Sequence, residues 1–193
     1  EPSALDPAAA SAGFEEDAVR QCALGPTVKG ADVSYYQGVI DWPAAARGGL
    51  GFAFARVADG TEVVDTQLSQ NWPGMKAAGV IRGAYHFFRP AQDPAAQATL
   101  FIAQLQKNGG LTAGDLPPAL DIEVTDGVAP KVVLARMQIW LDRVEAAFGK
   151  RPLIYTAPGF WEELDAAPSF GRYPLWLANW GTRCPAKPET WSR

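Results

Sequence analysis

The chain of 193 residues (20.7 kDa) is 48% hydrophobic and 20% charged, a composition that fits one globular domain with a sizeable core and excludes disordered and fibrous proteins. Its formal net charge is −4 and its basic residues form no continuous stripe, so a nucleic-acid-binding surface is not expected. All apolar runs are shorter than the roughly 20 residues that a membrane span requires, so we expect a soluble protein with no membrane span.

The chain divides into two parts of different pattern. Residues 1–28 are rich in Ala and show no sustained strand pattern, which predicts an appended arm with one short helix around Phe14 to Arg20. From Lys29 onward, short apolar runs alternate with longer helical stretches, and residues 29–193 are predicted to form the main domain.

The predicted strands of this domain are short and almost wholly apolar: Lys29–Tyr35, Phe52–Val57, Ile81–Phe87, Ala119–Glu123, Leu153–Thr156 and Pro174–Asn179. The predicted helices lie between them: Trp42–Arg47, Gln67–Ala78, Pro94–Asn108, Lys131–Phe148 and Gly159–Asp165. This alternation predicts a parallel sheet buried on both faces, in either an open doubly wound sheet or a barrel. Because no Gly-rich dinucleotide-binding turn follows the first strand, we predict an α/β fold of the irregular TIM-like β/α barrel type. About six strands are too few for a complete eight-stranded barrel.

Three acidic residues on predicted strands are candidates for catalysis. Asp121 and Glu123 end an apolar strand two residues apart, so both project from one face, and Asp32 lies on the first strand. Catalytic groups of barrels sit at the carboxyl ends of strands, and two neighbouring carboxylates in a partly desolvated pocket raise the pKa of one of them. Glycoside hydrolysis uses such a pair. The structural alternative is that Asp121 and Glu123 cap a strand and that Asp32 holds loop amides.

Aromatic residues on three predicted strands are candidates for lining a sugar site. Tyr85 and Phe87 share one strand face with His86 on the other, and Tyr155 and Trp176 lie on later strands. Pyranose rings expose C–H groups that pack on aromatic faces, although core packing explains the same pattern. We interpret His86 as a hydrogen-bonded core residue.

Metal ligands are scarce in this sequence. His86 is the single histidine, and Cys22 and Cys184 lie too far apart for a zinc or dithiol redox motif, so neither a zinc site nor a histidine-rich metal centre is expected. The two cysteines are compatible with one disulfide in an oxidising compartment or with two buried thiols.

Taken in order, these segments resemble the glycoside hydrolase family 25 lysozymes, the Chalaropsis-type muramidases. The resemblance rests on Asp32-Val33-Ser34 with Gln37-Gly38 and Asp41-Trp42, on Gly83-Ala84-Tyr85-His86-Phe87, on Pro118-Ala119-Leu120-Asp121-Ile122-Glu123, on Ile154-Tyr155-Thr156 and on Leu175-Trp176-Leu177-Ala178. The family continues with further strands, including a late acidic one. The resemblance therefore implies a barrel that lacks its last strands in this sequence, with residues 1–28 outside it.

The resemblance also implies an activity, namely retaining hydrolysis of the β-1,4 bond between N-acetylmuramic acid and N-acetylglucosamine in peptidoglycan. Glu123 would be the general acid, and Asp121 would assist, either by direct attack or through the 2-acetamido group of the substrate. Asp32 would hold the substrate or tune the pKa of its neighbours, and the cleft would be lined by Tyr85, Phe87, Tyr155 and Trp176. No cofactor is implied.

These implications lead to the hypothesis of a secreted or periplasmic muramidase that acts on the glycan strands of peptidoglycan. Two alternatives stay open at this point. One is a catalytically weak module that binds cell-wall glycans, and the other is a hydrolase of another N-acetylated glycan such as chitin.

Overall fold

The computed structural model describes residues 20–191, and its core is a sheet of six parallel strands in the order β1-β2-β4-β5-β6-β7. A short strand, β3, pairs antiparallel with β2. The strands are β1 Lys29–Val33, β2 Leu50–Asp59, β3 Val63–Val64, β4 Ile81–Phe87, β5 Ala119–Asp121, β6 Leu153–Thr156 and β7 Leu175–Leu177. The helices are α1 Trp42–Arg47, α2 Leu68–Ala77, α3 Pro94–Lys107, α4 Pro130–Phe148 and α5 Pro158–Glu163, with 3-10 turns η2 Tyr35–Gln37, η3 Pro168–Arg172 and η4 Glu189–Trp191.

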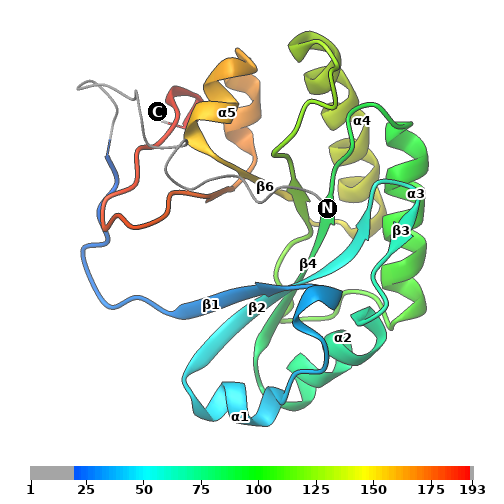
Figure 1. Ribbon diagram of the computed structural model, residues 1–193, viewed down its shortest axis with the longest axis vertical. Helices are drawn as coiled ribbons and strands as arrows, with labels where there is room; N and C mark the ends of the chain where they lie inside the picture. The colour runs from blue at the N-terminus through cyan, green and yellow to red at the C-terminus, as the bar shows by residue number, and fades with distance from the viewer. Residues whose placement is uncertain (1–19, 192–193) are drawn as a thin grey trace.

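The order of the parallel strands follows the order of the chain, which distinguishes this sheet from a doubly wound one, where the order reverses at a switch point. The sheet curls into a half-barrel with the long helices on its outer side (Figure 1). The prediction of a β/α barrel type is thus confirmed. Among the described residues β1 and β7 are the two edges of the sheet and do not pair with each other.

The larger of two hydrophobic clusters lies between the sheet and the helices. Trp72 of α2, Phe101 of α3 and Trp140 of α4 are fully buried there. A smaller cluster on the concave side contains Phe54 and Tyr85. The strands are apolar on both faces because each face packs against one of these clusters.

Residues at the ends of the helices account for several boundaries. The Asp93 carboxylate accepts a hydrogen bond of 2.7 Å from the Ala96 amide at the start of α3. Gly149 ends α4 in the left-handed conformation with φ of 63°.

Some predicted strands are too long because local polar groups end them early. β1 stops at Val33 since the next residue, Ser34, caps η2, and its own amide donates to Gln37 Oε1 at 2.8 Å. β5 stops at Asp121, so Glu123 lies on the loop that follows. The antiparallel hairpin of β3 was not predicted because its two residues carry no periodic pattern.

The described part of the predicted arm joins the C-terminal segment. Arg20 forms an antiparallel bridge with Ala186, and Cys22 and Cys184 form a disulfide. Figure 1 shows these blue and red segments side by side. The helix predicted around Phe14 to Arg20 lies, apart from Arg20, outside the described residues. None of the described helices is long and apolar enough to cross a membrane.

Candidate active site

Strand register places four candidate residues in one row across the concave face. Phe87 of β4 lies opposite Asp121 of β5, Asp121 opposite Tyr155 of β6, and Tyr155 opposite Trp176 of β7. Directly opposite residues of parallel strands project to the same side of a sheet. The row therefore forms a continuous surface near the carboxyl ends of four strands.

The three acidic candidates lie close enough together to influence one another. Asp121 is 5% exposed, Glu123 is half-buried, and Asp32 of β1 is exposed at the mouth. Burial, the Glu123 charge and a hydrogen bond between the two carboxyls raise the pKa of Asp121 well above its ordinary value. Burial is also the main cause that raises the pKa of Glu123, and the charge of Asp32 adds to it.

This arrangement retains a proton on an acidic pair at a pH where isolated carboxyls are ionised. The hydrogen bond between the two carboxyls raises the pKa of Asp121 and lowers that of Glu123, but burial keeps the pKa of both above the ordinary value. Asp32 shows the same tendency, because partial withdrawal of its carboxyl from water raises its pKa. Of the two carboxyls, that of Glu123 is the more open to the mouth and thus the better placed to meet a ligand.

Arg56 of β2 provides the positive charge of the site. It lies opposite Tyr85 in the sheet, and its side chain is 7% exposed. Its Nε donates to Asp65 Oδ2 at 3.1 Å, and the same carboxylate oxygen accepts a 2.9 Å hydrogen bond from the Tyr35 amide. Arg56 Nη2 is buried and has no hydrogen-bond partner among residues 20–191. The guanidinium charge lowers the pKa of Asp121, but burial and Glu123 outweigh it.

The two candidate tyrosines remain neutral hydrogen-bonding groups. Burial raises the pKa of Tyr85 and of Tyr155, and in both cases the charges of the site carboxylates add to the effect. The hydroxyl of each is therefore protonated throughout the physiological range and able to donate a hydrogen bond beside the carboxylates.

Aromatic rings form the floor of the concave face. Phe54 of β2 stacks on Trp176 with ring centroids 4.4 Å apart, and Tyr155 meets Trp176 edge-on at 4.6 Å. A groove of about 310 Å³ borders this floor. Its lining includes Asp32, Phe52, Tyr155, Trp176, Asn179 and Trp180. An aromatic floor beside carboxylates suits a ligand with apolar ring faces and polar edges, as in a pyranose.

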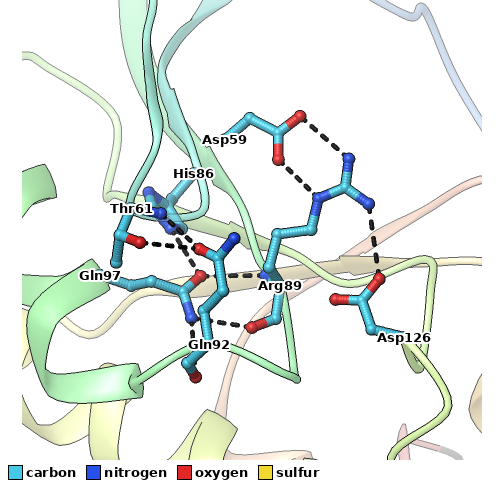
Figure 2. Close-up of polar contacts among 7 residues, drawn as sticks. All are labelled: Asp59, Thr61, His86, Arg89, Gln92, Gln97 and Asp126. Carbon is cyan, nitrogen blue, oxygen red and sulfur yellow. Dashed lines mark hydrogen bonds and ion pairs between the residues drawn. The ribbon is translucent and has the colours of Figure 1, made fainter.

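Phe87 differs from the other aromatic candidates because a cation covers it. The guanidinium of Arg89 lies 4.6 Å from the centre of the Phe87 ring. Arg89 also pairs with Asp59 at the end of β2 and with Asp126 on the loop after β5 (Figure 2). Phe87 thus lies in the row of the site but under this ion pair network.

His86 lies on the opposite face of β4 and is a core residue, as the sequence pattern indicates. It is fully buried, and its Nε2 lies 3.1 Å from Gln97 Oε1 of α3 (Figure 2). Since Gln97 Oε1 is an acceptor, the imidazole donates through Nε2, and burial lowers the pKa of His86 to about 4. Within residues 20–191, no cluster of three or more His, Cys, Asp and Glu side chains could hold a metal ion.

Sequence reasoning missed three residues of the site: Phe54, Arg56 and Asp65. The first two had a visible signal, because Phe52, Phe54 and Arg56 alternate along one strand and therefore share a face. The sequence contained no such signal for Asp65, because this residue follows strand β3, which was not predicted.

Comparisons of the sequence with known proteins agree on one family. Residues 31–193 match the model of glycosyl hydrolases family 25. The chain is 36% identical over 164 residues to the uncharacterized protein YegX of Escherichia coli K12, covering 82% of this chain and 58% of YegX. It is 34% identical over 188 residues to Lysozyme M1 of Streptomyces globisporus, covering 88% of this chain and 63% of that protein. The chain therefore spans less than two thirds of the length of these two relatives.

A solved structure agrees in fold. The bacterial lysozyme of Streptomyces coelicolor superposes with a TM-score of 0.76 at 29% identity, over 91% of this chain and 81% of that one. The half-barrel fold is thus shared with a solved bacterial lysozyme.

Proposed function

The chain belongs to glycosyl hydrolase family 25, and from this premise we propose that it is a muramidase. In this proposal it hydrolyses the β-1,4 bond between N-acetylmuramic acid and N-acetylglucosamine in peptidoglycan. The observation that carries the proposal is the buried acidic pair of Asp121 and Glu123, whose pKa values are both raised, beside an aromatic floor. Two of the similar proteins bear the names lysozyme and N,O-diacetylmuramidase, which supports the choice of substrate class.

The roles of the two acids follow from their exposure. Glu123 is half-buried at the mouth, so its oxygen can approach the leaving group, and we assign to it the general acid role. For that step Glu123 must hold a proton, and Asp121, which lies deeper, must be ionised. Asp121 then assists by orienting the 2-acetamido group as internal nucleophile or by attacking directly, and either route retains the anomeric configuration.

The remaining site residues are assigned to substrate binding. Asp32 faces the pair from β1 and raises the pKa of both members, so it tunes their protonation. Tyr155 and Trp176 are placed to pack on a sugar ring, and Tyr85 to donate a hydrogen bond to it. Phe87 contributes to the cleft indirectly, because Arg89 covers its ring.

In this proposal the main domain is residues 29–193, which carries all of these side chains, and the described part of the preceding segment is linked to it through the disulfide between Cys22 and Cys184. A disulfide is stable in oxidising surroundings, which supports a location outside the cytoplasm, in the secreted or periplasmic fraction. This is also where peptidoglycan is found.

The test is digestion of purified peptidoglycan by the intact protein and by Glu123→Gln in parallel, with mass spectrometry of the soluble products. We expect the intact protein to release fragments with reducing N-acetylmuramic acid, and the variant to be slower by about 10²–10⁴-fold because the proton donor is lost. Fragments ending in N-acetylglucosamine would contradict the assigned bond. Binding to the wall without any release would indicate a glycan-binding module, and preference for chitin would indicate a different hydrolase.

A further inference from the structure

The ion pair network around Arg89 lies at the carboxyl ends of three strands, and its member Asp126 follows the proposed acid Glu123 by three residues. Arg89 follows β4 and donates from Nε to Asp59 Oδ1 at 2.7 Å and from Nη2 to Asp59 Oδ2 at 3.2 Å. Its Nη1 lies 3.5 Å from Asp126 Oδ1 on the loop after β5 (Figure 2). A single guanidinium therefore bridges the end of β2 and the loop that carries Glu123.

The backbone of Arg89 is itself fixed from the opposite side. Gln97 of α3, which is fully buried, accepts a 3.0 Å hydrogen bond from the Arg89 amide and donates one of 2.9 Å to the Arg89 carbonyl (Figure 2). Arg136 of α4 donates to the carbonyl of the next residue, Pro90. The cation thus projects from a rigid base and is not a free surface side chain.

The loop that carries Glu123 is held at both of its ends. Before Glu123, the Ile122 amide donates to the Tyr155 carbonyl at 3.0 Å. After it, the Val128 amide donates to the Thr125 carbonyl at 2.9 Å and closes a tight turn. The turn places Asp126 at φ of 49° and Gly127 at φ of 74°, the pair of left-handed residues that an Asp-Gly turn requires. In this turn Asp126 directs its carboxylate to Arg89.

We propose that Arg89, paired with Asp59 and Asp126, is a positioning residue that fixes the Glu123 loop so that the Glu123 carboxyl faces the leaving oxygen of the substrate. This inference rests on the proposed muramidase function. It assigns Arg89 no contact with the substrate. The general acid depends on its geometry, because a displacement of about 1 Å at a reacting group costs on the order of 100-fold in rate.

A leaving-group comparison distinguishes this role from a purely structural one. A natural glycan leaves as a strongly basic alkoxide that must be protonated, whereas 2,4-dinitrophenolate leaves without a proton. Loss of the general acid, or of its correct position, should therefore slow cleavage of the natural substrate and leave cleavage of the activated substrate nearly unchanged. General damage to the fold should slow both equally.

The experiment measures kcat and KM for the full chain and for Arg89→Met, on soluble peptidoglycan fragments and on a short N-acetylmuramyl glycan bearing 2,4-dinitrophenolate. We expect Arg89→Met to lower kcat on the natural fragments by about 10- to 100-fold with KM within about twofold. On the activated substrate we expect less than threefold loss. Glu123→Gln should likewise lower kcat on the natural fragments and not on the activated substrate, and the decrease on the natural fragments should be larger.

Three further variants provide controls. Arg89→Lys should recover only part of the rate, because an ammonium cannot bridge Asp59 and Asp126 in the same planar geometry. Asp126→Asn should stay within about threefold of the intact protein, since Asn tolerates the left-handed backbone and still accepts a hydrogen bond. Arg172→Met, which removes an exposed pair with Glu145 on α4, should leave both substrates unaffected.

The outcomes separate this inference from the proposed function. Suppose that the intact protein cleaves both substrates. If Arg89→Met then lowers kcat equally on both, or lowers it on neither, the positioning role is wrong while the proposed muramidase function stands. If the intact protein cleaves neither substrate, the proposed function fails and the positioning role fails with it.

Discussion

Asp121 illustrates how single residues of this protein serve the site at the expense of the fold. Its side chain is 5% exposed, Oδ1 has no hydrogen-bond partner among residues 20–191, and the negative Glu123 is its neighbour. Each of these features raises the free energy of the ionised carboxylate in the folded state. The pKa of Asp121 in the folded protein lies above its ordinary value of 3.8. The free energy of unfolding therefore decreases as the pH rises from 3.8 to the pKa of the folded state.

This reasoning predicts that Asp121→Asn makes the protein more stable at neutral pH while removing a proposed catalytic group. An amide carries no charge, so the variant avoids the cost of the buried carboxylate. We expect a gain of about 1 kcal/mol, or about 2–4 °C in the thermal midpoint, at pH 7. The gain should shrink as the pH falls, because the wild-type carboxyl is then protonated.

Thermal unfolding of both proteins between pH 3 and pH 8 measures this difference directly. Glu123→Gln is the matched control and should show a smaller gain, since Glu123 is only half-buried. A constant difference at every pH would show that the charge of Asp121 is not its cause.

At the residue scale, the sequence singled out the candidate acids and not the cations. Asp32, Asp121 and Glu123 stand out because acidic residues are rarely found in predicted strands that are otherwise apolar. Arg56 was not predicted as a site residue although it shares a strand face with Phe52 and Phe54, and Arg89 was not predicted because its partners lie far along the chain. Arg89, for example, meets Asp126 across 37 residues, and no local pattern encodes that contact.

At the element scale, pairs of glycine and phenylalanine shape the concave face. Phe52 of β2 lies opposite Gly30 of β1, and Phe54 lies opposite Gly83 of β4. A Cβ placed on Gly83 would lie 2.3 Å from the Phe54 ring, and one on Gly30 would lie 2.0 Å from the Phe52 ring. The absence of a side chain on one strand therefore makes room for an aromatic ring from the next.

Gly83→Ala is accordingly predicted to destabilise the protein by about 1–3 kcal/mol, because the added methyl overpacks the sheet against Phe54. Since Phe54 stacks on Trp176 at 4.4 Å, its displacement should also weaken glycan binding. Chemical denaturation and binding to insoluble peptidoglycan are the two measurements.

A double-mutant cycle with Phe54→Ala identifies the contact responsible. In the Phe54→Ala background the added methyl group has space. Gly83→Ala should therefore lower the free energy of unfolding by much less there than in the intact protein. Equal costs in both backgrounds would show that another effect, such as a loss of backbone freedom, is responsible.

Element positions were largely predictable from the sequence, and element ends were not. The helix predicted over residues 42–47 has those bounds in the structure, and α4 begins one residue before its predicted start, because their apolar periodicity and Pro and Gly signals agree. β1 and β5 end earlier than predicted because Ser34 caps a turn and the chain after Ile122 leaves the sheet. These endings depend on hydrogen bonds that hydrophobic pattern does not report.

At the scale of the whole molecule, the half-barrel places its two edges on opposite sides of the site groove. β1 contributes Asp32 and β7 contributes Trp176, yet among the described residues these strands are not hydrogen-bonded to each other. The sequence predicted the curled parallel sheet, since alternating strands and helices allow few other folds. It left the state of the two cysteines open, because their separation of 162 residues says nothing about their distance in space.

The disulfide between Cys22 and Cys184 is the covalent connection between the segment before β1 and the segment after β7. Other contacts of the described arm are few and exposed, such as the 3.0 Å hydrogen bond from the Gln21 amide to the Pro185 carbonyl. Breaking the bond frees the unfolded chain from a closed loop of more than 160 residues, which increases its entropy.

We therefore predict that replacing both cysteines by serine lowers the free energy of unfolding by about 2–4 kcal/mol, measured by urea denaturation. Treating the intact protein with a thiol reductant should reproduce this loss, while the double serine variant should not respond to it. If the oxidised and reduced proteins unfold at the same urea concentration, the disulfide does not stabilise the protein by restricting the unfolded chain, contrary to this prediction. The two edges of the half-barrel would then be held in place by the packing of the sheet and its helices alone.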